Sequence, residues 1–433
     1  MKRKQFIKNA ALTAAGSMVV PYILPSGRLF AATGSRRANH VVFCLFAGGV
    51  RNLESVYKAE GNLMRNTLSG TESISPDIAP GITQLPLIAS SPLQTQGTLY
   101  KEFRYANGPT GHYNGHTTAI TGRYSDESIQ LKQPPKYPTI FEYYRKHTSP
   151  TTSALNAWWI SNQLGPYPYL NYSMYDGYGP AYGANMIQPA SIFNGSSISV
   201  LGDPLTISQA ERNKCDMMRD FMNGQFKVPQ QAASSGIVNT PQDAERLQVF
   251  LQNQIAQLSN IGDPWGTGAM TGDMINVYFG IEVLKEFKPE LMVINMTDID
   301  IAHFDYTKYA NAIGVADYAL YKLWQAINSI PEMAGDTVLI AVPEHGRNQI
   351  SNSVIDTYGR YALDHTSDEM SRKIFCLMAG KGVKTGQVLT VDGQGNGIGQ
   401  SVDVVPTIAN ILGIDNEIPF GMMEGRVLNE AFS

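Results

Sequence analysis

Histidine and carboxylate side chains occur together at several points of this sequence. The stretch Thr337–His345, TVLIAVPEH, is an apolar run that predicts a buried strand and ends with Glu344 and His345 side by side. Gly346 follows and allows a sharp turn. Open α/β sheets hold their ligands at the carboxyl ends of such strands. The pair therefore indicates a ligand site, although a structural contact between Glu344 and His345 explains it equally well.

Other polar groups follow a second predicted strand. Residues 291–296, LMVINM, form an apolar run, and Asp298, Asp300 and His303 come directly after it in one loop. His365 lies further along, in LDHTSD. The glycine-rich stretch 105–122 carries two more histidines, His112 and His116, ahead of a segment that starts a helix or extends a turn.

The elements that must position these residues alternate between strands and helices. Continuous apolar runs predict central strands at 41–46, 154–160, 291–296, 337–343 and 374–379. Helical patterns cover 139–147, 275–287, 311–330 and 401–412. A helix that leads into a buried strand indicates a right-handed parallel crossover. The sequence thus predicts an α/β fold, with a mostly parallel central sheet and helices on both faces.

The first 33 residues have the features of an export signal. A basic segment, MKRKQFIK, precedes a short apolar stretch, with small residues at Ala31 and Ala32 suited to cleavage. The order around Arg3 and Lys4 resembles a twin-arginine signal with lysine in place of the second arginine, so both that route and general secretion stay open. We expect a periplasmic or extracellular protein with no transmembrane segment in the mature chain, residues 34–433. Within it, residues 162–273 read as an insertion or cap.

Composition excludes several classes of protein. Of the 433 residues, 43% are hydrophobic and 16% are charged, as in an ordinary globular protein. The net charge is −4 and no basic tract occurs, which argues against nucleic acid as a partner. Three cysteines rule out a disulfide scaffold but allow one bridge between Cys44 and Cys376.

The order of these features resembles the alkaline phosphatase superfamily, which includes sulfatases, nucleotide pyrophosphatases and phosphoglycerate-mutase-like enzymes. The acidic loop with His303, the strand ending in Glu344-His345-Gly346, and the ending SVDVVPTIANILGI after His365 are similar to the superfamily's motifs in type and order. The stretch HTTAITGRY is similar to the segment after its nucleophile. The resemblance covers most of residues 38–146 and 275–430 and implies an alkaline-phosphatase-like fold.

The resemblance implies two divalent metal ions at the strand ends. Asp300, His303 and His365 match the ligands of one ion, with Asp298 as a rival to Asp300. Glu344 and His345 match an Asp-His pair that binds the other ion. The mixed donors suit zinc, with manganese, iron or calcium as alternatives.

Two positions depart from the superfamily's pattern. Ala47 stands where a strand-end aspartate would bind the second ion, and His112 stands at the position of the nucleophile, with Thr110 two residues out of register. An imidazole cannot replace a metal-bound alkoxide. His112 is therefore a candidate catalytic group or an added ligand, as in a sulfatase-like branch of the superfamily that also has histidine there. His116 reads as structural.

Two functions follow from this pattern. One is an exported metal-dependent hydrolase of phosphate or sulfate esters with a degenerate site, in which Arg51 and Arg347 bind a small anionic ester. The alternative is a non-catalytic metal-binding relative with a structural or binding role, whose partner is a protein of the cell envelope. We expect the strongest metal binding at Asp300, His303 and His365.

Overall fold

The structure is a computed structural model, and it describes residues 36–126, 134–148, 152–161, 170–189, 237–258, 263–268, 270–366 and 368–433. The predicted export signal and much of the predicted insertion lie outside these residues. So do residues 208–221, where a charged helical pattern in the sequence predicts a helix. The domain boundaries therefore stay predictions. Within the described ranges, the structure contains no helix with the length and apolar character needed to cross a membrane.

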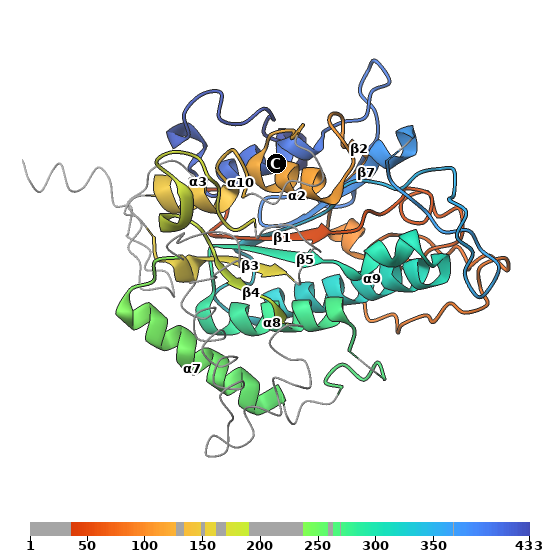
Figure 1. Ribbon diagram of the computed structural model, residues 1–433, viewed down its shortest axis with the longest axis horizontal. Helices are drawn as coiled ribbons and strands as arrows, with labels where there is room; N and C mark the ends of the chain where they lie inside the picture. The colour runs from red at the N-terminus through yellow and green to blue at the C-terminus, as the bar shows by residue number, and fades with distance from the viewer. Residues whose placement is uncertain are drawn as a thin grey trace, which may run out of the picture.

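An eight-stranded sheet lies at the centre of the molecule (Figure 1), in the order β4-β3-β5-β1-β6-β7-β2-β8. Its strands are β1 (His40–Phe46), β2 (Gly97–Arg104), β3 (Ala157–Ser161), β4 (Asn185–Ile187), β5 (Leu291–Met296), β6 (Thr337–Pro343), β7 (Lys373–Gly380) and β8 (Gln387–Leu389). The strands from β4 to β6 are parallel, and β7 is antiparallel to both of its neighbours. The predicted mostly parallel sheet is confirmed. The direction of β7 was beyond prediction, because an apolar run does not specify direction.

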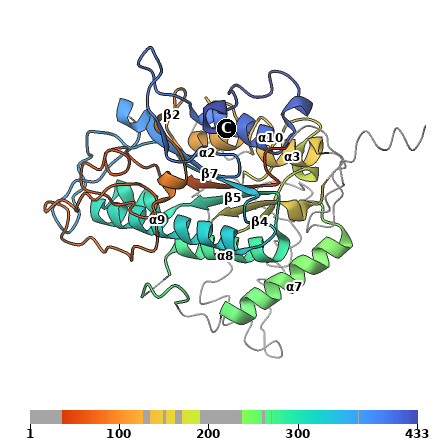
Figure 2. The same ribbon diagram turned by 180° about the vertical axis from the view of Figure 1, so that it is seen from behind.

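Helices cover both faces of the sheet, as predicted (Figures 1 and 2). One face packs against α7 (Pro241–Leu258), α8 (Gly272–Phe287) and α9 (Tyr306–Ser329), and the other against α2 (His112–Thr121), α3 (Ile140–His147) and α10 (Val404–Ile411). Alternate residues of a strand point to opposite faces. Accordingly, β1 sends Val42, Cys44 and Phe46 into the first core and Val41, Phe43 and Leu45 into the second.

This alternation also separates the two buried cysteines. Cys44 belongs to the core under α8 and α9, whereas Cys376 belongs to the core on the opposite face of the sheet. Both are free thiols. The bridge between them that the sequence allowed does not form, because the sheet lies between the two side chains.

Local sequence accounts for most of the helix boundaries. Asp305 caps α9 by accepting a hydrogen bond from the backbone N–H of Lys308, so this helix begins five residues before the predicted start at 311. The stretch from His112 forms helix α2 and not a turn. The prediction missed β2, because Lys101 and Glu102 interrupt its apolar pattern near the sheet edge.

Three adjacent parallel strands end at one level and build the floor of the candidate site. Phe46, at the end of β1, pairs with Met296 of β5 on one side and with Pro343 of β6 on the other. The residues that follow these strands therefore emerge next to one another at the carboxyl edge of the sheet, which is the usual ligand edge of parallel sheets.

Candidate metal centre

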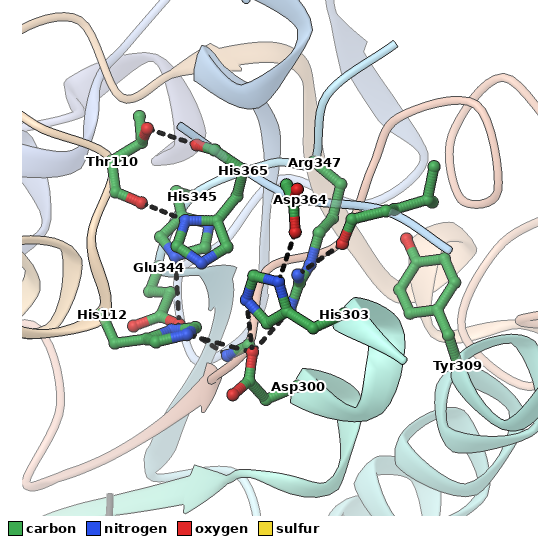
Figure 3. A network of polar contacts seen from close by, with 12 residues as sticks. Thr110, His112, Asp300, His303, Tyr309, Glu344, His345, Arg347, Asp364 and His365 are labelled. Atoms are coloured by element: carbon green, nitrogen blue, oxygen red, sulfur yellow. Dashed lines mark hydrogen bonds and ion pairs between the residues drawn. The ribbon is translucent and has the colours of Figure 1, made fainter. Parts of the chain in front are cut away.

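Four imidazoles and two carboxylates converge at this edge of the sheet (Figure 3). One group comprises His112, Asp300, His303 and His365, and a second comprises His112, Glu344 and His345; within each group, one donor atom per residue lies within 4.8 Å of the others. We call these six residues the centre. The structure thus brings together every metal ligand predicted from the sequence, while their binding of a metal stays a prediction.

Different elements supply the members of the centre. Glu344 and His345 follow β6, Asp300 and His303 lie on the short helix η4 (Asp298–His303), and His112 is the first residue of α2. The turn after β1 touches them closely. At Gly48, where φ is +95°, a Cβ atom would lie 2.3 Å from the backbone nitrogen of Asp300. Only glycine fits this position, because it is strained and sterically closed to a side chain.

Two histidines are oriented by hydrogen bonds from Nδ1. His303 Nδ1 lies 2.6 Å from a carboxylate oxygen of Asp364, and His365 Nδ1 lies 2.5 Å from the carbonyl oxygen of Thr110. Since both partners only accept, Nδ1 carries the proton and Nε2 keeps its lone pair. Metal-binding histidines are fixed in this way in proteins. Burial also lowers the pKa of both imidazoles, which keeps them neutral.

His345 is also oriented by a hydrogen bond from Nδ1, and its Nε2 is buried. Its Nδ1 lies 2.8 Å from the carbonyl oxygen of Gly346. Its buried Nε2 makes no hydrogen bond within the described part of the chain and lies 3.3 Å from a carboxylate oxygen of Glu344. Burial lowers the pKa of His345 to about 3. A buried lone pair that accepts no hydrogen bond lowers the stability of the folded protein, unless a cation or a proton approaches it.

His112 lies between the two carboxylates of the centre. Its Nδ1 is 2.7 Å from Glu344 and its Nε2 is 3.0 Å from Asp300. Burial alone would lower the pKa of His112, but the charges of Glu344 and Asp300 raise it to about 9. In the metal-free protein this side chain is therefore an imidazolium at neutral pH, with both nitrogens engaged.

Glu344 is the most heavily contacted carboxylate of the centre. Besides His112, it accepts a hydrogen bond from the backbone N–H of Gly48 at 2.5 Å and contacts Nδ1 of His116. Burial would raise the pKa of Glu344, but the imidazoles of His116, His345 and His112 hold it well below its usual value. His116 also contacts Asn295 through Nε2 at 3.0 Å. It is a buried positioning residue for Glu344.

Asp300, and not Asp298, faces the other members of the centre. Asp300 accepts a hydrogen bond from Arg347 at 2.7 Å and lies 3.4 Å from Nε2 of His303. Asp298 instead accepts a hydrogen bond from the backbone N–H of Asp273 at 3.0 Å, and its own N–H donates back to Asp273 at 3.2 Å. This reciprocal pair directs the Asp298 carboxylate away from the histidines.

The two arginines predicted to bind substrate both have protein partners. Besides its ion pair with Asp300, the buried Arg347 donates to the carbonyl oxygen of Leu363 at 2.9 Å. Arg51 forms an ion pair with Glu54 at 2.5 Å and donates to the carbonyl oxygen of Asn348 at 3.0 Å. Anion binding by either arginine stays a prediction, and it requires rearranged hydrogen bonds at Arg51.

The nucleophile position offers no free hydroxyl. Thr110, the nearest candidate in the sequence, donates its hydroxyl proton to the carbonyl oxygen of His365. Ala47 is buried at the end of β1 and supplies no donor atom. The centre therefore has imidazole and carboxylate groups for chemistry, and the assignment of His112 to the nucleophile position stays a prediction from the resemblance.

Sequence reasoning missed one residue that supports the centre, Asp364, and it interpreted His116 as structural without identifying Glu344 as its partner. Asp364 fixes His303, and its place directly before His365 is the signal that could have identified it. His116 contacts Glu344 across 228 positions of sequence, and its spacing of four from His112 on a helix was the available clue.

Fold and centre together define an α/β protein with a candidate metal centre at the carboxyl edge of its sheet. Solved structures similar to the chain include an alkaline phosphatase superfamily protein from Vibrio parahaemolyticus, with 12% identity, coverage of 97% of this chain and 80% of that one, and a TM-score of 0.44. They also include alkaline phosphatase PafA, which is 9% identical. That match covers 92% of this chain and 100% of PafA, with a TM-score of 0.46. The PsFucS1 sulfatase from Pseudoalteromonas sp. is 13% identical; the match covers 92% of this chain and 72% of the sulfatase, with a TM-score of 0.46. No protein-family model and no curated protein matches the sequence.

Proposed function

We propose that this protein is an exported metal-dependent hydrolase of phosphate or sulfate esters. The observation that carries the proposal is the convergence of three imidazoles, each with Nδ1 bound to an acceptor, on two carboxylates. Export is inferred from the basic and apolar features of residues 1–33 alone.

The donor set fits a divalent metal ion. The lone pairs of His303, His345 and His365 belong to neutral imidazoles, and the buried Nε2 of His345 makes no hydrogen bond in the described structure. Nitrogen-rich sites of this kind suit zinc, and manganese or iron are alternatives, whereas calcium takes mostly oxygen ligands. When bound, the metal ion would act as a Lewis acid that polarises the ester.

The residues of the centre divide into a stronger and a weaker site. Asp300, His303 and His365 would hold one ion, with Asp364 and the carbonyl of Thr110 orienting the histidines. Glu344 and His345 would hold a second ion less tightly, because Ala47 adds no carboxylate. The charge of Arg347, paired with Asp300, would help to hold the anionic part of the substrate.

One observation favours the non-catalytic alternative, in which the chain binds metal and serves the cell envelope through a protein partner. Both nitrogens of His112 are engaged by carboxylates, and the hydroxyl of Thr110 is engaged by a backbone carbonyl. Neither group is poised to attack an ester in this state. The two functions differ in turnover, which decides between them.

The test measures hydrolysis of p-nitrophenyl phosphate and p-nitrophenyl sulfate with zinc and with a chelator. The hydrolase proposal expects release of p-nitrophenol that depends on zinc. It also expects at least a tenfold increase in the double variant His112→Thr, Ala47→Asp, which restores a hydroxyl and a carboxylate. Inactivity of both proteins, with zinc binding retained, would replace the proposal by the non-catalytic alternative.

The rival carboxylates can be separated by a pair of matched variants. We expect Asp300→Asn to weaken zinc binding by about 10- to 100-fold, because it removes a charged donor that faces His303. Asp298→Asn should change zinc affinity less than threefold, since Asp298 contacts Asp273 instead. Competition with a fluorescent zinc chelator measures both. A larger effect for Asp298→Asn would reverse the assignment.

Zinc binding should release about one proton at pH 7.5. Because the pKa of His112 is raised to about 9 in the metal-free protein, this residue should lose its proton when a divalent ion brings positive charge beside Asp300 and Glu344. His345, with a pKa of about 3, is already neutral. Affinity should therefore rise with pH up to about 9 and then level off. Calorimetry in two buffers of different ionisation enthalpy counts the protons that are released. A count of zero would show that His112 keeps its proton when zinc binds and would contradict the prediction.

A further inference from the structure

The centre opens to solvent on one side. The side chains of Asp300 and Asp364 are each 43% exposed and that of His303 is 24% exposed, whereas Glu344 and His345 are fully buried. A substrate must therefore approach past Asp300, His303 and Asp364. What surrounds these three residues decides which esters can bind.

Large apolar side chains are exposed in the two segments beside this opening. One segment is the junction between η4 and α9, and the other is the chain that links β6 to β7. We call their exposed residues the apolar rim; they are Phe304, Ile350, Val354, Ile355, Tyr358 and Tyr361. Phe304 is 67% and Ile350 is 76% exposed. Single exposed apolar residues are common in proteins, but a concentration of them next to a polar site indicates ligand binding.

Hydrogen bonds hold the second segment against the centre. Asn352 Nδ2 donates to the carbonyl oxygen of His303 at 3.2 Å and to the Asp364 carboxylate at 3.1 Å. Leu363 N–H donates to the carbonyl oxygen of Ala302 at 2.8 Å. In Figures 1 and 2 this light-blue chain before β7 runs beside one end of α9. The segment is thus fixed beside the residues that form the opening.

The tip of the same segment is fixed to the start of α9. Ile355 and Tyr361 are paired across an antiparallel bridge. Between them, the Asp356 carboxylate accepts hydrogen bonds from the backbone N–H and the hydroxyl of Thr307, at 2.9 and 2.6 Å. Thr307 lies three residues after Phe304. The rim residues are therefore presented by an ordered hairpin next to Phe304, whose ring centroid is 6.1 Å from that of His303.

We propose that the apolar rim binds the alcohol portion of the substrate, so that the substrate is an ester of a long alkyl or aryl alcohol. The proposal rests on the proposed hydrolase function, because the anionic part would occupy the centre. Its apolar part would then extend past His303 over Phe304 and the hairpin. Removal of apolar surface from water supplies the affinity, which grows with the apolar area covered.

The test measures binding of methylphosphonate and octylphosphonate, two anions that cannot be hydrolysed in the way an ester is, to the zinc-loaded protein by calorimetry. We expect octylphosphonate to bind at least about tenfold more tightly than methylphosphonate, since each buried methylene adds to the affinity. Phe304→Ala and Tyr361→Ala should each reduce this ratio about threefold or more. The matched control is Phe420→Ala, which removes a fully exposed phenyl group outside the rim. Equal affinities for the two anions, or a ratio that none of the variants changes, would overturn the proposal.

Turnover separates this proposal from the proposed function. If binding of the phosphonates depends on chain length but octyl phosphate is not hydrolysed, the apolar rim is supported as a ligand site. The proposed hydrolase function is then wrong. If zinc-dependent hydrolysis has the same kcat/KM for methyl phosphate and octyl phosphate, and Phe304→Ala does not change it, the hydrolase function is supported. The proposal that the apolar rim binds the substrate is then wrong. If phosphatidylglycerol vesicles bind the protein through Phe304 while octylphosphonate shows no preference, the rim is a membrane contact and the substrate proposal is wrong.

Discussion

Replacing His365 by alanine is expected to weaken zinc binding by at least about 100-fold. His365 is buried, and its Nδ1 is held by the carbonyl oxygen of Thr110, so its Nε2 faces the other donors in a fixed orientation. Loss of an oriented imidazole would remove one of the three ligands proposed for the stronger site. The loss of a residue that only orients a ligand already costs about 10- to 100-fold in metal affinity. Competition against a chelator of known affinity gives the dissociation constant.

The matched control is His147→Ala. His147 lies on α3, where its ring contacts the hydroxyl of Tyr178 at 2.8 Å, outside the centre. Its replacement should leave zinc affinity unchanged within about twofold. Circular dichroism and a urea unfolding curve check that the His365 variant is folded. An undiminished zinc content in a folded His365→Ala protein would contradict the assignment of the stronger site.

Glu344→Gln is expected to destabilise the metal-free protein by about 3 kcal/mol at pH 7. The substitution keeps the size of the side chain but leaves the His112 imidazolium with one carboxylate partner instead of two, and it changes the contacts of His116 and His345. Removal of one partner from a buried ion pair typically costs about 3–5 kcal/mol, because the remaining charge stays buried. Urea unfolding in the presence of a chelator measures the difference.

The same variant should change the pH dependence of stability. The folded protein raises the pKa of His112 to about 9, above the value of about 6.5 in an unfolded chain. The resulting stabilisation is fully present below about pH 6.5 and is lost as the pH rises to about 9, for a total of about 3 kcal/mol. The free energy of unfolding of the wild type should therefore fall across this interval. In Glu344→Gln the fall should be much smaller, and an equal fall in both proteins would show that the Glu344 charge does not hold the proton on His112.

A proton on His112 and a bound metal ion would compete at the centre. Without metal, the His112 imidazolium supplies positive charge between Glu344 and Asp300, at 2.7 and 3.0 Å. A divalent ion in the same space would bring its own charge and would no longer need that proton. The charges of Glu344 and Asp300 would thus be balanced in both states, by the imidazolium in one and by the metal ion in the other.

The sequence by itself determined the strands that build the centre and the groups at their ends. Apolar runs define β1, β5 and β6, and each run stops where the chain meets the carboxyl edge of the sheet. The positions of Asp300, His303, Glu344 and His345 follow from this, because a strand and the residue after it are fixed by local pattern. The parallel order of these strands was predictable because helices connect them.

Only the tertiary structure decided how these groups are used. The pairing of His112 with Glu344 spans 232 positions, and that of His365 with Thr110 spans 255, so no local pattern records them. The choice of Asp300 over Asp298 depends on a contact with Asp273 at the start of α8. Each of these outcomes depends on segments far apart in sequence that meet at one edge of the sheet, where distances of a few ångströms set which nitrogen carries a proton and which oxygen faces the centre.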